Sequence, residues 1–198
     1  MRTLEEAALD ASTCTRCRLS QGRTQVVYGV GDPNADLMFI GEAPGFHEDK
    51  QGEPFVGAAG QLLNQLLTEI DVPRDDVYIN NVILCRPPGN RDPLPDELEA
   101  SKPWLDERVS LIDPTVVVTL GNWATRYILG RQVSISRVRG QRFPWSGRTV
   151  IPTFHPAAVL HGGGQASNQM TALRADFQEI RRALAERPQP AEEQLGLF

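Results

Sequence analysis

The sequence predicts a three-layer α/β/α sandwich built around a central, mainly parallel four-stranded sheet. Four apolar segments rich in β-branched residues alternate along the chain with segments of helical periodicity, which is the order found in parallel α/β sheets. The strand-like segments are apolar almost throughout, as strands buried on both faces are. With 198 residues and 40% hydrophobic content, the chain suffices for one such domain.

The expected strands are residues 37–41, 77–83, 116–120 and 149–154. Helices are expected where apolar side chains recur every three or four positions, over residues 58–70, 95–112, 122–129 and 170–187. We take residues 1–187 as one domain. Residues 188–198 are expected to be a disordered linker and tail, because the linker is rich in proline and glutamate.

Composition bears on location and partners. We expect a cytoplasmic, monomeric protein without membrane contact, because the sequence shows neither a signal peptide nor an apolar run of about 20 residues. The net charge of −5 argues against nucleic acid, yet residues 115–150 contain six arginines and no acid. That stretch carries +6 and the remainder −11, a segregation that favours a DNA-binding face. Scattered solvated arginines are the alternative.

Distinctive motifs follow the predicted strands. In open parallel sheets, ligands bind beyond the carboxyl ends of the strands, so these positions are examined first. The motifs there are Gly41-Glu42-Ala43-Pro44-Gly45, then Asn81 with Cys85-Arg86-Pro87-Pro88, and finally Phe154-His155-Pro156. Each alone is a weak signal, since turns rich in glycine and proline are common after strands.

Together with Glu48-Asp49, Pro54-Phe55-Val56-Gly57 and Asn90-Arg91, these motifs resemble the family-4, iron–sulfur type of uracil-DNA glycosylase. The resemblance extends from Cys14 to Arg182. It implies the uracil-DNA glycosylase fold. It also implies a monofunctional repair enzyme that hydrolyses the N-glycosidic bond of a uracil flipped out of DNA, releasing free uracil and leaving an abasic site.

The resemblance assigns roles in a pocket for the flipped base. Phe55 is expected to stack beneath uracil, as a phenyl face suits a pyrimidine. Asn81 is expected to read O4 and N3 of uracil, because an amide offers both a donor and an acceptor. His155 is expected to donate to O2 as negative charge builds there, assisted by the backbone amides of Gly41 to Ala43.

Two acids complete the expected pocket. Glu42 lies near the sugar, where it either orients water or stabilises an oxocarbenium-like state. Ala43 stands where family-1 glycosylases have an aspartate, so general-base catalysis from that position is excluded. Glu48 is expected to crowd the C5 edge of the base and reject thymine. A solvated surface glutamate is the alternative for Glu48.

The same resemblance suggests DNA contacts. The loop with Pro87, Pro88, Asn90 and Arg91 corresponds to a DNA-pinching element, and Leu160 to an apolar wedge that fills the vacated stack. Arg137 and Arg139 are expected to contact phosphates.

Family members hold a [4Fe–4S] cluster with four cysteines. Cys14, Cys17 and Cys85 match three of them, whereas the fourth position is Ser101. A serine oxygen is a harder and less acidic ligand than a thiol. Three arrangements stay open: a cluster with Ser101 or water on the fourth iron, which we favour, a [3Fe–4S] cluster, or zinc in a mixed site. In each, the centre is expected to be structural.

The last five residues resemble the peptide that binds bacterial sliding clamps. We expect Gln194, Leu195, Leu197 and Phe198 to be the contacts, because clamp grooves accept short peptides through leucine and phenylalanine anchors. The alternative is a tail that packs on its own domain.

Three other functions are compatible with parts of this pattern. The chain could be a non-catalytic uracil- or lesion-binding relative with a degraded cluster site, as Ser101 suggests. It could belong to the crosslinking branch of the superfamily, but the basic inserted loop of that branch is missing between Cys85 and Asp96. It could be an unrelated nucleotide-binding protein, for which the fold is equally suitable, although it has no Gly-x-Gly-x-x-Gly motif.

Overall fold

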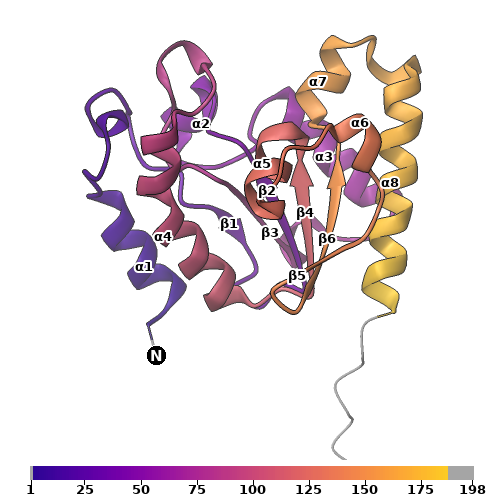
Figure 1. Ribbon diagram of the computed structural model, residues 1–198, viewed down its shortest axis with the longest axis horizontal. Coiled ribbons are helices and arrows are strands. Elements are labelled where there is room, and N and C mark those ends of the chain that lie inside the picture. Colours follow the sequence, from indigo (N-terminus) through magenta and orange to yellow (C-terminus); the bar gives the residue numbers. More distant parts are fainter. Residues whose placement is uncertain (1, 187–198) are drawn as a thin grey trace, which may run out of the picture.

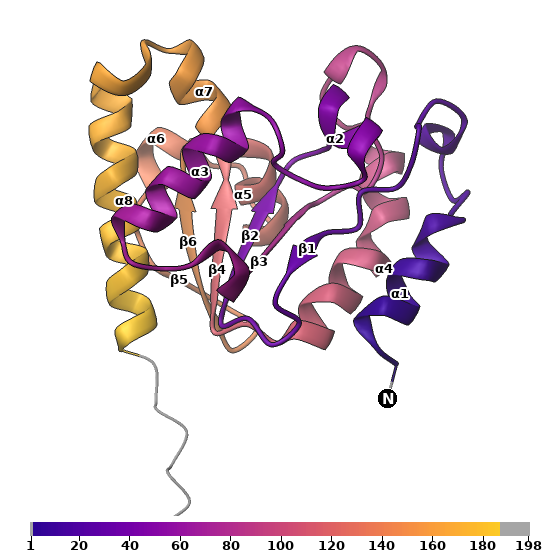
Figure 2. The same ribbon diagram turned by 180° about the vertical axis from the view of Figure 1, so that it is seen from behind.

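The computed structural model describes residues 2–186, which form a sheet covered by helices on both faces (Figures 1 and 2). In this part of the chain, no helix has the length and apolar character needed to cross a membrane. The sheet with helices on both of its faces confirms the predicted three-layer α/β class.

The sheet has six strands in the order β1-β3-β2-β4-β6-β5. Its four central strands are parallel, as predicted, and pair in a register that sets Phe39 beside Ile79 on one side and Val118 on the other. The strands are β1 (Val30–Gly31), β2 (Leu37–Gly41), β3 (Val77–Asn81), β4 (Val116–Leu120), β5 (Phe143–Trp145) and β6 (Arg148–Thr153).

The expected number of four strands was wrong because two antiparallel strands were missed, one at each edge of the sheet. β1 has two residues and β5 has three, and neither is buried throughout. β1 pairs with β3, which lies far along the chain, so local sequence does not reveal it. β5 instead forms a hairpin with β6 through Ser146 and Gly147, which both have positive φ, and this local turn signal was missed.

The α-helices are α1 (Leu4–Ser12), α2 (Phe46–Gln51), α3 (Ala58–Glu69), α4 (Pro95–Ile112), α5 (Gly121–Leu129), α6 (Ile135–Val138), α7 (Pro156–His161) and α8 (Asn168–Ala185). The four predicted helices correspond to α3, α4, α5 and α8. Helix α1 was missed, although its capping box between Thr3 and Glu6 is a recognisable start signal.

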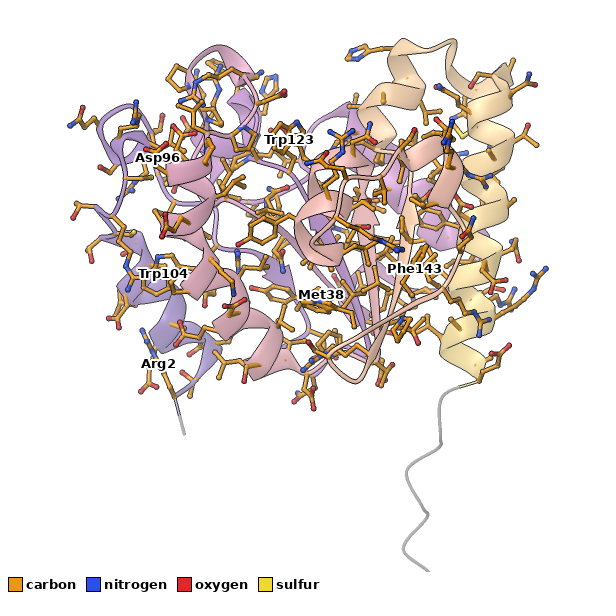
Figure 3. All side chains as sticks on the ribbon, in the orientation of Figure 1. Arg2, Met38, Asp96, Trp104, Trp123 and Phe143 are labelled. Atoms are coloured by element: carbon orange, nitrogen blue, oxygen red, sulfur yellow. The ribbon has the colours of Figure 1, made fainter. Side chains whose placement is uncertain are left out.

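Alternate residues of β2 point to the two layers of the core. Met38 and Ile40 pack with α1, α4 and α5, whereas Leu37 and Phe39 pack with α3 and α8. Met38 lies inside the domain, and Trp104 lies on the part of α4 that faces α1 (Figure 3). This alternation is why each central strand is apolar throughout.

The parallel strands all end at the same edge of the sheet, where α2 and α7 also lie (Figures 1 and 2). Gly41 at the end of β2 is in register with Asn81 at the end of β3, and His155 follows β6. The sheet therefore brings the three predicted motifs to one edge.

Candidate active site

A cavity of about 720 Å³ opens at this edge of the sheet. Its volume is in the range of small-molecule sites. The predicted residues that line it are Glu42, Ala43, Glu48, Phe55, Asn81, Pro87, Asn90, Arg91 and His155. The tertiary structure thus brings together side chains that the sequence motifs had suggested for one pocket.

Gly41, at the end of β2, is not among the residues that line the cavity, but it allows two side chains that do, those of Asn81 and Phe55, to approach each other. A Cβ atom at this position would lie 2.3 Å from Oδ1 of Asn81 and 3.0 Å from the ring of Phe55. Real Cβ atoms do not come as near to another heavy atom as the first of these distances. The glycine is therefore required by packing at the site.

Phe55 is buried and has a left-handed backbone conformation, with φ of 56°. For a bulky side chain this conformation is unfavourable by about 1–3 kcal/mol. Close packing holds it, because a Cβ atom at Gly60 of α3 would lie only 1.5 Å from the carbonyl oxygen of Phe55. Gly60 was not among the predicted residues. Backbone strain of this kind is found where side chains must be aimed at a ligand.

His155 begins α7 and caps it, with Nδ1 accepting a hydrogen bond from the backbone N–H of Ala157 at 3.2 Å. Burial lowers the pKa of His155 to about 4, so the ring is neutral at neutral pH. Since Nδ1 is an acceptor, the proton of the neutral ring is on Nε2. The imidazole can therefore donate one hydrogen bond without carrying charge.

Asn81 is 2% exposed, and within residues 2–186 its side-chain amide makes no hydrogen bond to protein. Its backbone carbonyl accepts from Nη2 of Arg108 at 3.0 Å. Buried amides are normally hydrogen-bonded, so an amide that lines a cavity without a partner is available to a ligand.

Glu42 is partly buried in the cavity wall. Burial, followed by the negative charge of Asp92, raises the pKa of Glu42 to about 7. The carboxyl group therefore exchanges its proton close to neutral pH, which is a property of groups that act on protons or developing charge.

Glu48 bends back over the backbone of its own loop. A Cβ atom at Gly45 would lie 2.8 Å from Oε2 of Glu48. The side chain is partly buried and lines the cavity, a position that favours a role in shaping the pocket over that of a solvated surface residue.

The loop after β3 contains a short 3-10 helix, Pro88–Asn90, and is braced at both ends. Arg86 donates to Oδ1 of Asn90 at 2.7 Å, and Arg91 forms a two-bond ion pair with the buried carboxylate of Glu97 at 2.8 and 2.6 Å. Pro88 and Asn90 are exposed. The loop therefore presents a rigid edge beside the cavity.

Three of the six arginines of the expected basic face are ion-paired with acids of the same chain. Arg139 is ion-paired with the buried Asp176 and lies over the ring of Phe154, so its guanidinium already has partners within the protein. Its role as a phosphate contact stays a prediction. Arg142 pairs with Glu179 of α8 and with Glu186, which follows the last residue of that helix. Arg148 pairs with Asp113. For these three arginines, the charge separation along the sequence is offset by acids that the fold brings close.

Arg137 and Leu160 have different surroundings. Arg137 is exposed and makes no ion pair in the described part of the chain; with Arg126 it lines a second hollow, of about 400 Å³. Leu160 is half-buried and packs against the core beneath α7. This packing gives Leu160 a structural function, and its wedge role stays a prediction.

Three thiols gather beside α4. Cys14, Cys17 and Cys85 pack against the same core cluster, and all three are free cysteines. Trp104 donates to Sγ of Cys14 at 3.3 Å, and Arg23 donates to Sγ of Cys85 at 3.4 Å. Burial raises the pKa of Cys85, opposed by Arg23.

Ser101 is buried one helical turn before Trp104, on the same helix that contacts Cys14. Within residues 2–186, no three His, Cys, Asp or Glu side chains are placed to hold one metal ion. An iron–sulfur cubane takes each ligand on a different iron, so its thiolates need not converge on a single point. Three thiols, with N–H donors beside two of them, are the kind of ligand that such a cluster takes.

Several cavity residues were missed in the sequence. Phe46 and His47 of α2 and His161 of α7 line the cavity, so all three histidines of the chain face it. Only their closeness to the motifs could have pointed to them. The expected clamp contacts, Gln194, Leu195, Leu197 and Phe198, lie outside the described residues.

Comparison with known proteins supports the resemblance. A sequence model of the Uracil DNA glycosylase superfamily matches residues 28–184. A type-4 uracil-DNA glycosylase from Sulfurisphaera tokodaii is 45% identical over 190 residues, covering 91% of this chain and 84% of that protein. One from Thermotoga maritima is 48% identical over 149 residues, covering 74% and 78%.

A type-5 uracil-DNA glycosylase from Thermus thermophilus is also similar, at 32% identity over 164 residues, covering 73% of this chain and 74% of that protein. An unrelated nucleotide-binding protein is therefore no longer a candidate. With this breadth of coverage and the higher identity to the type-4 proteins, the chain belongs to the uracil-DNA glycosylase superfamily and, within it, to the type-4 family.

Proposed function

We propose that this protein removes uracil from DNA by hydrolysing its N-glycosidic bond, leaving an abasic site for base excision repair. The observation that carries this proposal is that a neutral imidazole donor, an unpartnered buried amide and an aromatic ring face one cavity. These are the groups needed to stabilise, read and stack an extruded pyrimidine.

Recognition of the base falls to Phe55 and Asn81. Uracil stacks on the phenyl ring, and the Asn81 amide donates to O4 while accepting from N3–H. Cytosine presents an amino group and an unprotonated N3 at these positions, so both hydrogen bonds are lost. Glu48 limits the space beside C5, where thymine carries its methyl group.

Bond cleavage leaves negative charge on uracil, chiefly at O2. Nε2–H of His155 donates to this oxygen, and a preorganised donor in a site with little water contributes about 3 kcal/mol to the transition state. A neutral imidazole serves here because no proton has to be transferred. Backbone N–H groups of the Gly41–Ala43 turn add to the stabilisation.

Glu42 acts on the sugar side. As a carboxylate it stabilises the positive charge that develops on the sugar ring, or orients the water that attacks C1′. Its pKa of about 7 means that both protonation states are populated at neutral pH. Ala43 supplies no acid or base.

DNA is held around the cavity mouth. The braced loop with Pro87, Pro88, Asn90 and Arg91 contacts the backbone, and Arg137 offers an exposed guanidinium to phosphate. We further propose that the protein works as a monomer in the cytoplasm.

We propose that Cys14, Cys17, Cys85 and Ser101 bind an iron–sulfur cluster, with three thiolates and a weaker fourth position. When bound, the cluster supplies covalent links between the N-terminal segment, the loop after β3 and α4. Arg23 and Trp104 donate hydrogen bonds to two of the sulfur atoms, and such hydrogen bonds orient and tune the ligands of a bound cluster. Hydrolysis of the N-glycosidic bond requires no redox step, so the proposed role of the cluster is structural. A [3Fe–4S] cluster and a mixed zinc site are the other arrangements.

We also propose that the C-terminal residues Gln194, Leu195, Leu197 and Phe198 bind the bacterial sliding clamp. Deleting the last five residues should abolish retention on immobilised clamp and leave uracil excision from short oligonucleotides unchanged. Retention equal to that of the full chain would refute clamp binding.

The experiment that decides the main proposal is turnover on a single- or double-stranded oligonucleotide with one uracil. The purified protein, metal centre retained, should release free uracil and produce alkali-labile sites, and an otherwise identical thymine oligonucleotide should stay intact. Tight binding of the uracil strand without turnover would instead support the non-catalytic alternative.

A further inference from the structure

Arg108 of α4 is fully buried. In the described part of the chain, no carboxylate lies within ion-pairing distance of its guanidinium. Burying a cation without a counter-charge is costly, so such residues persist only where specific partners compensate them. The guanidinium also lies over the ring of Tyr28, with Cζ 5.1 Å from the ring centroid.

The partners of Arg108 are two backbone carbonyls. Nη1 donates to the carbonyl of Tyr28, and Nη2 donates to the carbonyl of Asn81 at 3.0 Å. Arginine presents its N–H groups in a rigid fork, so one guanidinium can hold two acceptors at a set separation. Two of the guanidinium nitrogens are thus held by main-chain oxygens from two separate segments, whereas Nε has no hydrogen-bond partner in the described part of the chain.

These carbonyls lie where the pairing of β1 with β3 is interrupted. Val30 and Gly31 pair with Ile79 and Tyr78, and the next backbone bond runs from Val27 to Leu84 at 2.9 Å. Between them Gly29 turns the chain, with φ of 143°. Tyr28 and Asn81 face this gap, and Arg108 supplies the donors that a continuous ladder would have supplied.

Of the two residues whose carbonyls Arg108 holds, Asn81 is the one that lines the cavity. Its side-chain amide has no protein partner in residues 2–186, and Gly41 on the neighbouring strand offers no side chain to hold it. The direction of a strand side chain follows from its backbone. We infer that Arg108 is a positioning residue for base recognition: by holding the carbonyl of Asn81, it sets the orientation of the amide that reads uracil.

This inference rests on the proposed function and is tested with three variants. Arg108→Met keeps the length of the stem and removes all donors. Arg108→Lys keeps the charge without the fork. Val109→Ala is the matched control, because Val109 is the next residue on α4, is 5% exposed in the same core cluster and has no side-chain donor for the carbonyl of Asn81. Uracil excision, inhibition by free uracil and binding of abasic-site DNA are measured for each.

Free uracil reports on the pocket alone, whereas abasic-site DNA reports on the surrounding loops. For Arg108→Met we expect uracil inhibition to weaken by at least about tenfold, with abasic-site binding changed by less than about twofold. Arg108→Lys should weaken uracil inhibition by about threefold. Val109→Ala should lower the melting temperature and leave both uracil inhibition and abasic-site DNA binding unchanged.

The inference is overturned if Arg108→Met leaves inhibition by free uracil unchanged, or if it weakens uracil inhibition and abasic-site DNA binding in proportion. In either case, uracil excision by the wild type leaves the proposed function standing. Should Arg108→Met fail to fold, unchanged uracil inhibition in Arg108→Lys overturns it equally. A wild-type protein that neither excises nor binds uracil overturns the proposed function, and this inference with it.

Discussion

The imidazole of His155 lies against the phenyl ring of Phe55, with ring centroids 5.5 Å apart and ring planes inclined by 24°. The two residues follow different elements, and only the folded sheet edge brings them into contact. Each ring limits the movement of the other, so a base that stacks on Phe55 meets an imidazole in a defined orientation. The contact joins the stacking surface to the hydrogen-bond donor.

Replacing His155 with Ala should lower kcat for uracil release by about 100-fold or more, because a preorganised donor to O2 is lost. Binding of uracil-containing DNA should change by less than about threefold, since most contacts to DNA lie outside this ring. Single-turnover kinetics and fluorescence anisotropy measure the two quantities.

His161→Ala is the matched control, because His161 lines the same cavity from the end of α7. It should retain nearly full activity. Equal losses in both variants would show that the imidazole of His155 has no special role.

Asn81→Asp should admit cytosine. A protonated carboxyl group, or a carboxylate that accepts from the cytosine amino group, pairs with the edge that the wild-type amide rejects. We expect measurable cytosine excision together with at least about tenfold slower uracil excision. Asn90→Asp changes an amide at the rim of the same cavity and should leave the preference for uracil intact. If cytosine stays uncut in Asn81→Asp, the amide does not read the base.

The pH profile should report Glu42. Burial and Asp92 raise the pKa of Glu42 to about 7, so the carboxylate fraction increases about tenfold between pH 6 and pH 8. If the carboxylate is the active form, kcat rises over that interval and then levels off. His155, with a pKa of about 4, stays neutral throughout and adds no slope. Glu42→Gln should be slower and show a flat profile; a retained slope would assign the titration elsewhere.

The same raised pKa affects stability in the opposite direction. The folded protein binds the Glu42 proton more tightly than the unfolded chain does, so the contribution of this residue to the free energy of unfolding falls as pH rises from 4.5 towards 7. Urea unfolding of the wild type and Glu42→Gln across this interval measures the difference. A stability difference that is independent of pH contradicts the assigned pKa.

Gly41→Ala should damage the pocket without unfolding the domain. The added methyl group would have to displace Asn81 or Phe55, because it would lie 2.3 Å from one and 3.0 Å from the other. We expect kcat/KM for uracil to fall by at least about tenfold. Gly57→Ala is the control, since a Cβ atom there meets only Glu48, at an ordinary 3.8 Å. Similar activity in both variants would mean that the close approach at Gly41 is not needed.

Ser101→Cys should strengthen metal binding, because a fourth thiolate replaces a hydroxyl that ionises poorly. We expect iron and sulfide contents to approach four each per chain, and the cluster absorbance to bleach more slowly with a chelator than in the wild type. Ser20→Cys, near Cys17 but outside the proposed ligand set, is the control. If both variants hold the same iron as the wild type, Ser101 is not a ligand position.

Much of the fold could be predicted because its central strands are buried on both faces and its long helices have one apolar side. The strands around Phe39 and Val118 and the helix that ends at Ile112 are marked by their own residues. The short edge strand β1 is not, since its hydrogen bonds are made with a distant segment, whereas β5 pairs with the adjacent β6 across the turn at Ser146 and Gly147. Helix α1 carried a capping signal at Thr3 and Glu6 that was overlooked.

The sequence by itself determined which groups stand at the strand ends, because parallel strands deliver Gly41, Asn81 and His155 to one edge whatever surrounds them. Only the tertiary structure decided their states. The charge of Arg139 is cancelled by Asp176, the pKa of Glu42 is raised by burial, and the carbonyl of Asn81 is held by Arg108. Electrostatic and hydrogen-bond energies depend on distance in space and on exclusion of water, and neither can be read from position along the chain.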